Sequence, residues 1–169
     1  AAAAKTLRAT RMMRPTWVDI DLSTIRSNVT KLKALAGDAM MCAVVKANAY
    51  GLGFVPVANR LFEVGCRQFF VATVAEGLAL RELLPSAEIY VMAGAQAEEE
   101  AVMRDAGLIP TLNSHEQIVR WTEMPDSKQH PTVVHIDTGM ARLGLDSREL
   151  NQLSLDTRVL ERLSLAYVM

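Results

Sequence analysis

Short apolar segments recur along this chain, and each is followed by a segment with helical spacing. Their starts are roughly 20 to 30 residues apart, which is typical of βα units. Nearly continuous apolar strands are typical of a parallel sheet that is covered on both faces. The sequence therefore predicts six strand–helix units and the start of a further strand, arranged as a barrel or as an open doubly wound sheet. The apolar segments lie at Trp17–Asp21, Met40–Lys46, Gln68–Ala72, Glu88–Met92, Ile109–Leu112, Thr132–Asp137 and Leu163–Met169.

The expected helices begin and end at residues that typically start and stop helices. Thr73 with Glu76, and Ser114 with Gln117, have the spacing of capping boxes. The acidic triplet at 98–100 suits the first turn of a helix, where the dipole favours anions, better than it suits a metal site. The expected helices run from near Ser23 to Gly37, from near Pro56 to Gly65, from Thr73 through Leu84, over Ala97–Ala106, from Ser114 through Met124 and, in one piece or two, from Ser147 to Arg162.

The glycines after the Met40–Lys46 segment favour one of the two arrangements. An open dinucleotide-binding sheet would carry a glycine-rich phosphate turn here, and Gly51-Leu-Gly53 lacks the third glycine of that fingerprint. A TIM-type (β/α) barrel is therefore the preferred fold of this α/β chain. The active site of such a barrel lies at the carboxyl ends of its strands, where Lys46 and the segment Asp137–Arg142 both fall.

The composition argues against several classes of partner. A formal net charge of −1 and a pI near 6.4 provide no field for nucleic acid or a membrane surface. No apolar run approaches the roughly 18 residues of a membrane span. The three histidines and two cysteines show no metal-ligand spacing, so no metal site is expected.

Both cysteines are expected to be buried and reduced, as in a cytoplasmic protein, and a single disulfide is the alternative. Residues 1–14 are basic and lack the apolar segment of a secretory signal, so they are interpreted as a disordered tail.

Lys46 ends an apolar run in which a charge is unexpected. The stretch from Met40 to Gly53 reads MMCAVVKANAYGLG. Removing an ammonium group from water is costly unless the charge is paired or neutralised. Lys46 is therefore either a strand-end cation that reaches the solvent or an amine placed at a pocket for chemistry. At the dry mouth of a barrel the neutral, nucleophilic amine would become accessible.

Three segments resemble one family of enzymes. The segment Ala43-Val-Val-Lys-Ala-Asn-Ala-Tyr-Gly-Leu-Gly53 resembles the pyridoxal-phosphate lysine motif of bacterial alanine racemases, which are fold-type III enzymes. His135-Ile-Asp-Thr-Gly-Met-Ala-Arg-Leu-Gly144 resembles the second signature of that family, and Trp17-Val-Asp-Ile-Asp-Leu resembles its usual start. The resemblance covers about residues 14 to 169. It implies that residues 15–169 are the N-terminal part of the barrel domain, with about six of eight barrel units preceded by an N-terminal strand.

The resemblance implies roles for three residues. Lys46 would form the covalent link to pyridoxal 5'-phosphate and act as a base at the substrate Cα. Tyr50 would hold the cofactor phosphate, and Arg142 would reach toward the cofactor phenolate oxygen and the substrate carboxylate, which suits a bidentate guanidinium. The implied reaction interconverts L-alanine and D-alanine for peptidoglycan supply in a cytoplasmic homodimer. The other interpretations are packing for Tyr50 and a surface loop residue for Arg142.

The chain departs from the family pattern in two respects. Many members carry a carbamylated lysine, which orients the arginine, where this chain has His135. Histidine cannot supply a carbamate, so either another anion replaces it or something else holds Arg142. The other interpretation of His135 is a near-core histidine with its hydrogen bonds satisfied. The chain also stops before the remaining barrel strands, the C-terminal β domain and the tyrosine that acts on the opposite face, and so is interpreted as a fragment with poor activity. The alternatives are an inactive cofactor-binding barrel, a fold-type III decarboxylase fragment and an amino-acid racemase of broader specificity.

Overall fold

The sheet consists of parallel strands in sequence order. The computed structural model describes residues 18–169. Each strand pairs in parallel with the next one along the chain. A doubly wound sheet would reverse its strand order at a switch point, whereas continuous order is the winding of a barrel. The expectation of an incomplete TIM-type barrel is therefore confirmed. The six strands are β1 (Cys42–Val44), β2 (Gln68–Val71), β3 (Glu88–Val91), β4 (Leu108–Leu112), β5 (Thr132–Val134) and β6 (Leu165–Val168).

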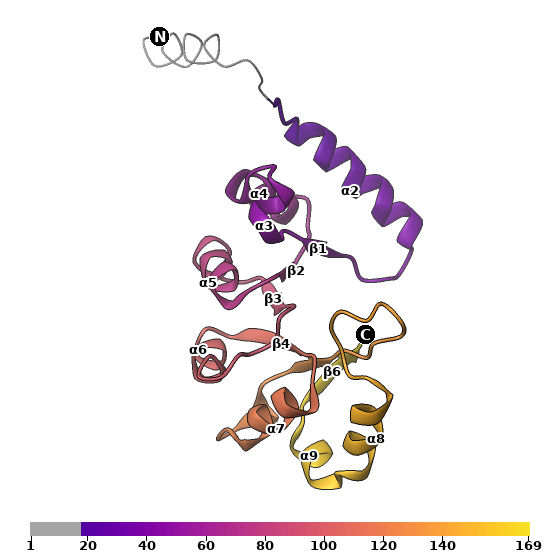
Figure 1. Ribbon diagram of the computed structural model, residues 1–169. Coiled ribbons are helices and arrows are strands. Elements are labelled where there is room, and N and C mark those ends of the chain that lie inside the picture. The colour runs from indigo at the N-terminus through magenta and orange to yellow at the C-terminus, as the bar shows by residue number, and fades with distance from the viewer. Residues whose placement is uncertain (1–17) are drawn as a thin grey trace.

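Helices cover one side of this curved sheet. Figure 1 shows the helices from α4 to α9 along the outer side of the strands, with α2 beyond β1. Helix α2 packs against α4, and Lys33 Nζ donates a hydrogen bond to the Val64 carbonyl at 2.8 Å. The last expected helix is in two pieces, α8 and α9. The helices are α2 (Leu22–Ala36), α3 (Lys46–Tyr50), α4 (Phe54–Glu63), α5 (Val74–Leu83), α6 (Glu100–Asp105), α7 (His115–Glu123), α8 (Ser147–Leu155) and α9 (Thr157–Arg162), with a 3-10 turn at Ser127–Gln129.

The strands divide their side chains between two apolar clusters. In β4, Leu108 and Leu112 pack with the helices, whereas Ile109 lies in a cluster made of strand residues alone. That second cluster includes Tyr90, whose ring stacks on Phe70 with the ring centroids 4.8 Å apart. Because successive side chains of a strand point to opposite faces, the second cluster lies on the concave side, inside the partial barrel.

The strand predicted at Trp17–Asp21 is wrong where the structure describes it. Trp17 and the predicted disordered tail at residues 1–14 lie outside the described residues. Residues 18–21 form no strand, and Val18 is 76% exposed. A strand needs a neighbour to take up its backbone hydrogen bonds, and within residues 18–169 no strand pairs with this segment.

Asp21 instead begins the first described helix. Its carboxylate accepts hydrogen bonds from the backbone N–H groups of Ser23, at 2.8 Å, and Thr24, at 3.3 Å, and from both hydroxyls. These bonds stabilise the charged form and lower the pKa of Asp21 to about 2. The aspartate is therefore the N-cap of α2, a role for which its short acceptor side chain is well suited.

The acidic triplet at residues 98–100 is only partly helical. Helix α6 begins at Glu100 rather than at Ala97, because the backbone of Glu98 has a φ of 73°, in the left-handed region. Glu100 is buried and pairs with Arg120, whose Nε lies 2.8 Å from its Oε1. The triplet thus combines a turn with an ion pair between α6 and α7.

The two cysteines differ in burial, and both are free. Cys66 is buried as predicted, and burial raises the pKa of its thiol. The prediction that Cys42 is buried is wrong. Cys42 lies in β1, which is at the edge of the sheet, so no further strand among residues 18–169 covers it on that side.

Candidate active site

Lys46 stands at the carboxyl end of β1. The strand ends at Val44, and the next N–H, that of Val45, donates to the Phe70 carbonyl of β2 at 3.0 Å. Lys46 is half-buried and is the first residue of α3. The strand thus stops two residues before the predicted end, and the lysine begins a turn instead of ending the strand.

The turn that follows Lys46 is left-handed. The backbone φ lies between 51° and 56° at every residue from Ala47 to Tyr50, the segment termed the left-handed turn below. Each residue in this conformation costs roughly 1–2 kcal/mol, so the surrounding structure must hold it in place. Local bonds contribute, because the Asn48 side-chain oxygen accepts the Phe54 N–H at 2.7 Å.

Glu76 fixes the start of the left-handed turn from the neighbouring βα unit. Its carboxylate accepts the Ala47 N–H at 2.8 Å and the Ala72 N–H at 2.7 Å. The Thr73 hydroxyl accepts the Glu76 N–H at 3.3 Å, as the predicted capping box requires. The predicted return bond from Glu76 to the backbone N–H of Thr73 is wrong: the two carboxylate oxygens accept from Ala47 and Ala72 instead.

Gln117 makes an equivalent link two units further along the sheet. The Ser114 hydroxyl accepts the Gln117 N–H at 3.2 Å, which confirms that half of the second capping box. The Gln117 side chain accepts the Asn113 N–H at 2.8 Å and donates to the Ala93 carbonyl at 3.1 Å. Helix-start side chains therefore connect adjacent loops at the carboxyl end of the sheet.

Tyr50 closes the left-handed turn. Tyr50 is 64% exposed. Gly51 follows with a φ of 83° and donates its N–H to the Ala47 carbonyl at 3.0 Å. A Cβ at Gly51 would meet nothing within 4 Å, which leaves open space beside the turn.

Arg142 lies in a loop that Asp137 organises. The Asp137 carboxylate accepts the N–H groups of Gly139, at 2.9 Å, and Ala141, at 3.0 Å. These bonds lower the pKa of Asp137. The Asp137 N–H donates to the Leu145 carbonyl at 2.9 Å and so closes the loop. Arg142 is exposed at the rim of this loop.

His135 is half-buried and bonded to a neighbouring loop. Its Nδ1 lies 2.8 Å from Asn113 Oδ1. The Asn113 amide nitrogen donates to the carbonyls of Met92, at 2.9 Å, and Thr111, at 2.7 Å. This arrangement agrees with the interpretation of His135 as a histidine whose hydrogen bond is satisfied.

The three predicted site residues come from two loops at one end of the sheet. Lys46 and Tyr50 share the segment after β1, and Arg142 follows β5. The carboxyl ends of the strands are where barrel enzymes hold their active sites. Within residues 18–169, no hydrogen bond or ion pair joins Arg142 to Lys46 or Tyr50. The sequence analysis did not place Glu76 and Asn113 at the carboxyl end of the sheet. For Glu76, the capping-box spacing from Thr73 indicates a position at a helix start, whereas no pattern in the sequence indicates the role of Asn113.

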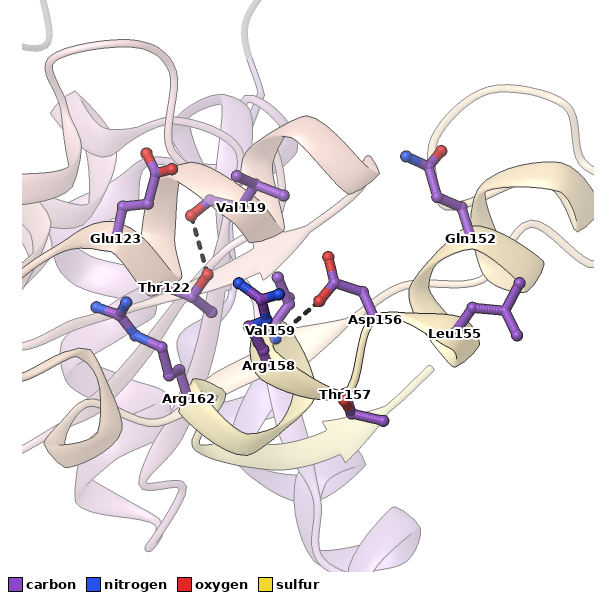
Figure 2. A pocket seen from close by; sticks show the side chains of 10 residues that line it. All are labelled: Val119, Thr122, Glu123, Gln152, Leu155, Asp156, Thr157, Arg158, Val159 and Arg162. Atoms are coloured by element: carbon purple, nitrogen blue, oxygen red, sulfur yellow. Dashed lines mark hydrogen bonds between the residues drawn. The ribbon is translucent and has the colours of Figure 1, made fainter.

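A hollow of about 610 Å³ lies elsewhere, on the outer helical layer (Figure 2). It is formed by α7, α8 and α9, and Asp156 Oδ1 accepts the Val159 N–H there at 3.2 Å. None of the predicted site residues lines it. Its lining residues are Val119, Thr122, Glu123, Gln152, Leu155, Asp156, Thr157, Arg158, Val159 and Arg162.

Residues 18–169 contain neither a metal-binding group of side chains nor a membrane-spanning helix. Across residues 18–169, no three or more His, Cys, Asp or Glu side chains are grouped so that they could hold a metal ion. In the same part of the chain, no helix is both long and apolar enough to cross a membrane.

The fold and the strand-end lysine define a class: (β/α)-barrel proteins with an amine at the carboxyl face of the sheet. The family model described as "Alanine racemase, N-terminal domain" matches residues 20–169, and the chain belongs to this family. The catabolic alanine racemase of Agrobacterium fabrum is 44% identical over 153 residues, which are 89% of this chain and 39% of the relative. The alanine racemase of Brucella ovis is 39% identical over 151 residues, or 88% of this chain and 38% of the relative.

Solved structures agree with this assignment. The alanine racemase of Bartonella henselae with covalently bound pyridoxal phosphate has a TM-score of 0.81 at 37% identity, covering 88% of this chain and 42% of that chain. The alanine racemase of Bacillus anthracis with bound L-Ala-P has a TM-score of 0.79 at 31% identity, covering 92% and 41%. The chain thus spans about two fifths of the length of the relatives it matches.

Proposed function

We propose that this chain is the lysine-bearing part of an alanine racemase that uses pyridoxal 5'-phosphate to interconvert L-alanine and D-alanine. The observation that carries the proposal is Lys46, a half-buried amine at the carboxyl end of β1 followed by the left-handed turn. Membership of the family and the cofactor in the Bartonella henselae structure support it.

The residues present fit the cofactor chemically. The Lys46 amine is a nucleophile that can bond to the cofactor aldehyde, and the Tyr50 hydroxyl can donate a hydrogen bond to the phosphate. The open space at Gly51 lets a ligand approach the backbone there. The Arg142 guanidinium can bind the phenolate oxygen and the substrate carboxylate as a fixed cation. When bound, the cofactor supplies an electron sink for the charge left at Cα.

Lys46 would then act as the base on one face of the substrate. Racemisation requires proton transfer on both faces of Cα, and the described residues, 18–169, offer one candidate base. We propose that the complete enzyme is a homodimer in which a partner subunit contributes the group on the opposite face. Reduced cysteines agree with a cytoplasmic enzyme, and supply of D-alanine to peptidoglycan is the proposed purpose.

A second candidate function is cofactor binding without turnover. The edges of the sheet expose apolar side chains, with Val44 41%, Tyr167 40% and Val168 56% exposed. Exposed apolar strand edges favour aggregation over a stable active site. By this interpretation, the chain alone captures the cofactor but racemises alanine poorly.

Two measurements test the proposal. The chain is incubated with pyridoxal phosphate, reduced with borohydride and mapped by mass spectrometry, and the cofactor should be found on Lys46. The Lys46→Ala chain should lose this adduct, whereas Lys128→Ala, which removes an exposed lysine, should retain it. An adduct distributed over surface lysines would contradict the proposal.

Turnover is measured in a chimera in which residues 20–169 replace the matching segment of the Agrobacterium fabrum racemase. The chimera should racemise alanine and lose that activity with Lys46→Ala. Retained racemisation in the Lys46→Ala chimera would contradict the role of the lysine. Release of CO₂ from an amino acid would favour a decarboxylase instead.

A further inference from the structure

The carboxylate of Glu76 lies between two loops of the catalytic end of the sheet. One oxygen accepts the N–H of Ala47, which follows β1, and the other accepts the N–H of Ala72, which follows β2. Glu76 is half-buried, so these charge-assisted bonds are partly shielded from water. A helix cap requires neither contact, because Thr73 already accepts the N–H of Glu76.

The bond to Ala47 acts directly on the lysine. The N–H of Ala47 belongs to the peptide group that joins it to Lys46, and this peptide group is planar. Holding the N–H therefore restrains rotation about the Cα–C bond of Lys46, and with it the direction in which the side chain leaves this peptide group. Ala47 is also the first left-handed residue of the turn, where an unsupported backbone would relax to an ordinary conformation.

We propose that Glu76 is a positioning residue for Lys46: its carboxylate ties the peptide group after the lysine to the β2–α5 loop and so holds the amine in reach of the cofactor. This inference rests on the proposed function for its consequence in catalysis. The bridge, which is the pair of hydrogen bonds from the Ala47 and Ala72 N–H groups to the Glu76 carboxylate, can be tested without turnover.

The geometry predicts a graded response to substitution. Glu76→Gln keeps one acceptor oxygen but places an amide NH₂ where the second N–H needs an acceptor. Glu76→Ala removes both acceptors. Thr73→Ala is the matched control, because it weakens the same helix start without removing either bond to the Glu76 carboxylate.

The first readout is the exchange of backbone amides with deuterium in this chain. The amides of Ala47 and Ala72 should exchange faster in Glu76→Ala than in the unmodified chain, with Glu76→Gln intermediate, whereas Thr73→Ala should leave them protected. Unchanged exchange in both Glu76 variants would overturn the proposed bridge. If Glu76→Ala does not fold, amide exchange is compared between the unmodified chain and the nearly isosteric Glu76→Gln variant.

The second readout is the rate at which Lys46 captures pyridoxal phosphate, followed by borohydride quenching over time. We expect a fall of roughly tenfold in Glu76→Ala, since small misplacements of reacting groups cost up to about 10²-fold, and no fall in Thr73→Ala. Capture at the unmodified rate in both Glu76 variants overturns the positioning role. If the unmodified chain itself does not capture the cofactor on Lys46, the proposed function fails, and the exchange data still decide whether the bridge exists.

Discussion

The Nδ1 atom of His135 and the Oδ1 atom of Asn113 lie 2.8 Å apart, and this contact determines where the imidazole carries its proton. Asn113 Nδ2 donates to two backbone carbonyls, which leaves Oδ1 as the acceptor that faces the histidine. His135 must therefore donate from Nδ1. In the neutral ring, Nε2 is then an acceptor and can receive a hydrogen bond from a donor.

The first prediction concerns this tautomer. At a pH at which the ring is neutral, nitrogen NMR should show His135 protonated at Nδ1 alone. In Asn113→Ala the restraint is lost, and the ring should shift toward a mixture of tautomers. The same variant should destabilise the fold by roughly 1–3 kcal/mol, because the buried carbonyls lose their donor. Protonation at Nε2 in the unmodified chain would contradict the assigned hydrogen bonds.

A second prediction concerns Arg81, which binds backbone carbonyls of two loops at the opposite end of the sheet. Its guanidinium donates to Ala106 at 2.9 Å, Ala87 at 2.6 Å and Gly107 at 2.8 Å, and partial burial lowers its pKa. Arg81→Ala should lower the free energy of unfolding in urea by about 2–4 kcal/mol, because several carbonyls lose a charged donor.

The control is Arg104→Ala, which breaks a surface pair with Asp105 and should lower the free energy of unfolding by about 0–1 kcal/mol. Equal losses in the two variants would contradict this explanation.

The order of the barrel units was predictable from the sequence, whereas the local geometry of the site was not. Apolar runs and helix signals alternate along the chain, and parallel pairing between consecutive units follows from that rhythm. The segment at Trp17–Asp21 has the same apolar pattern, but its described residues, 18–21, have no pairing partner among residues 18–169. A pattern shows that a segment can form a strand, and only a neighbouring strand makes it one.

The site residues show the same difference between what a sequence pattern indicates and what the packing of the folded chain decides. Lys46, Tyr50 and Arg142 were named from motifs, and the structure places them at one end of the sheet. The left-handed turn carries alanines at positions that glycine would normally occupy, so propensity could not predict it. The Glu76–Ala47 bond joins residues 29 apart in sequence, and such a contact exists only once two βα units are packed together.

A third prediction concerns the pH dependence of the loop that carries Arg142. The pKa of Asp137 is lowered by the hydrogen bonds from Gly139 and Ala141. A lowered pKa means that the folded loop favours the carboxylate. The contribution of Asp137 to the stability of the loop is therefore complete above the ordinary pKa of an aspartate, and it is lost as the pH falls through the lower pKa of the folded state. Amide signals of Gly139 should follow this titration in NMR. In Asp137→Asn they should be independent of pH in that range, and an unchanged titration there would assign it to another group.

The last prediction compares two glycines with positive φ. At Gly144, with φ of 102°, a Cβ would lie 2.7 Å from the Asp137 nitrogen and 3.0 Å from the Ile136 carbonyl carbon. At Gly51, with φ of 83°, it would meet nothing within 4 Å. Gly51→Ala should therefore cost only the backbone strain, about 1–2 kcal/mol. Gly144→Ala should add a clash with backbone that cannot move aside, and should destabilise the fold by more than about 2 kcal/mol. Thermal unfolding of the two variants provides the comparison. A larger loss at Gly51 would show that the open space beside the left-handed turn is filled in solution.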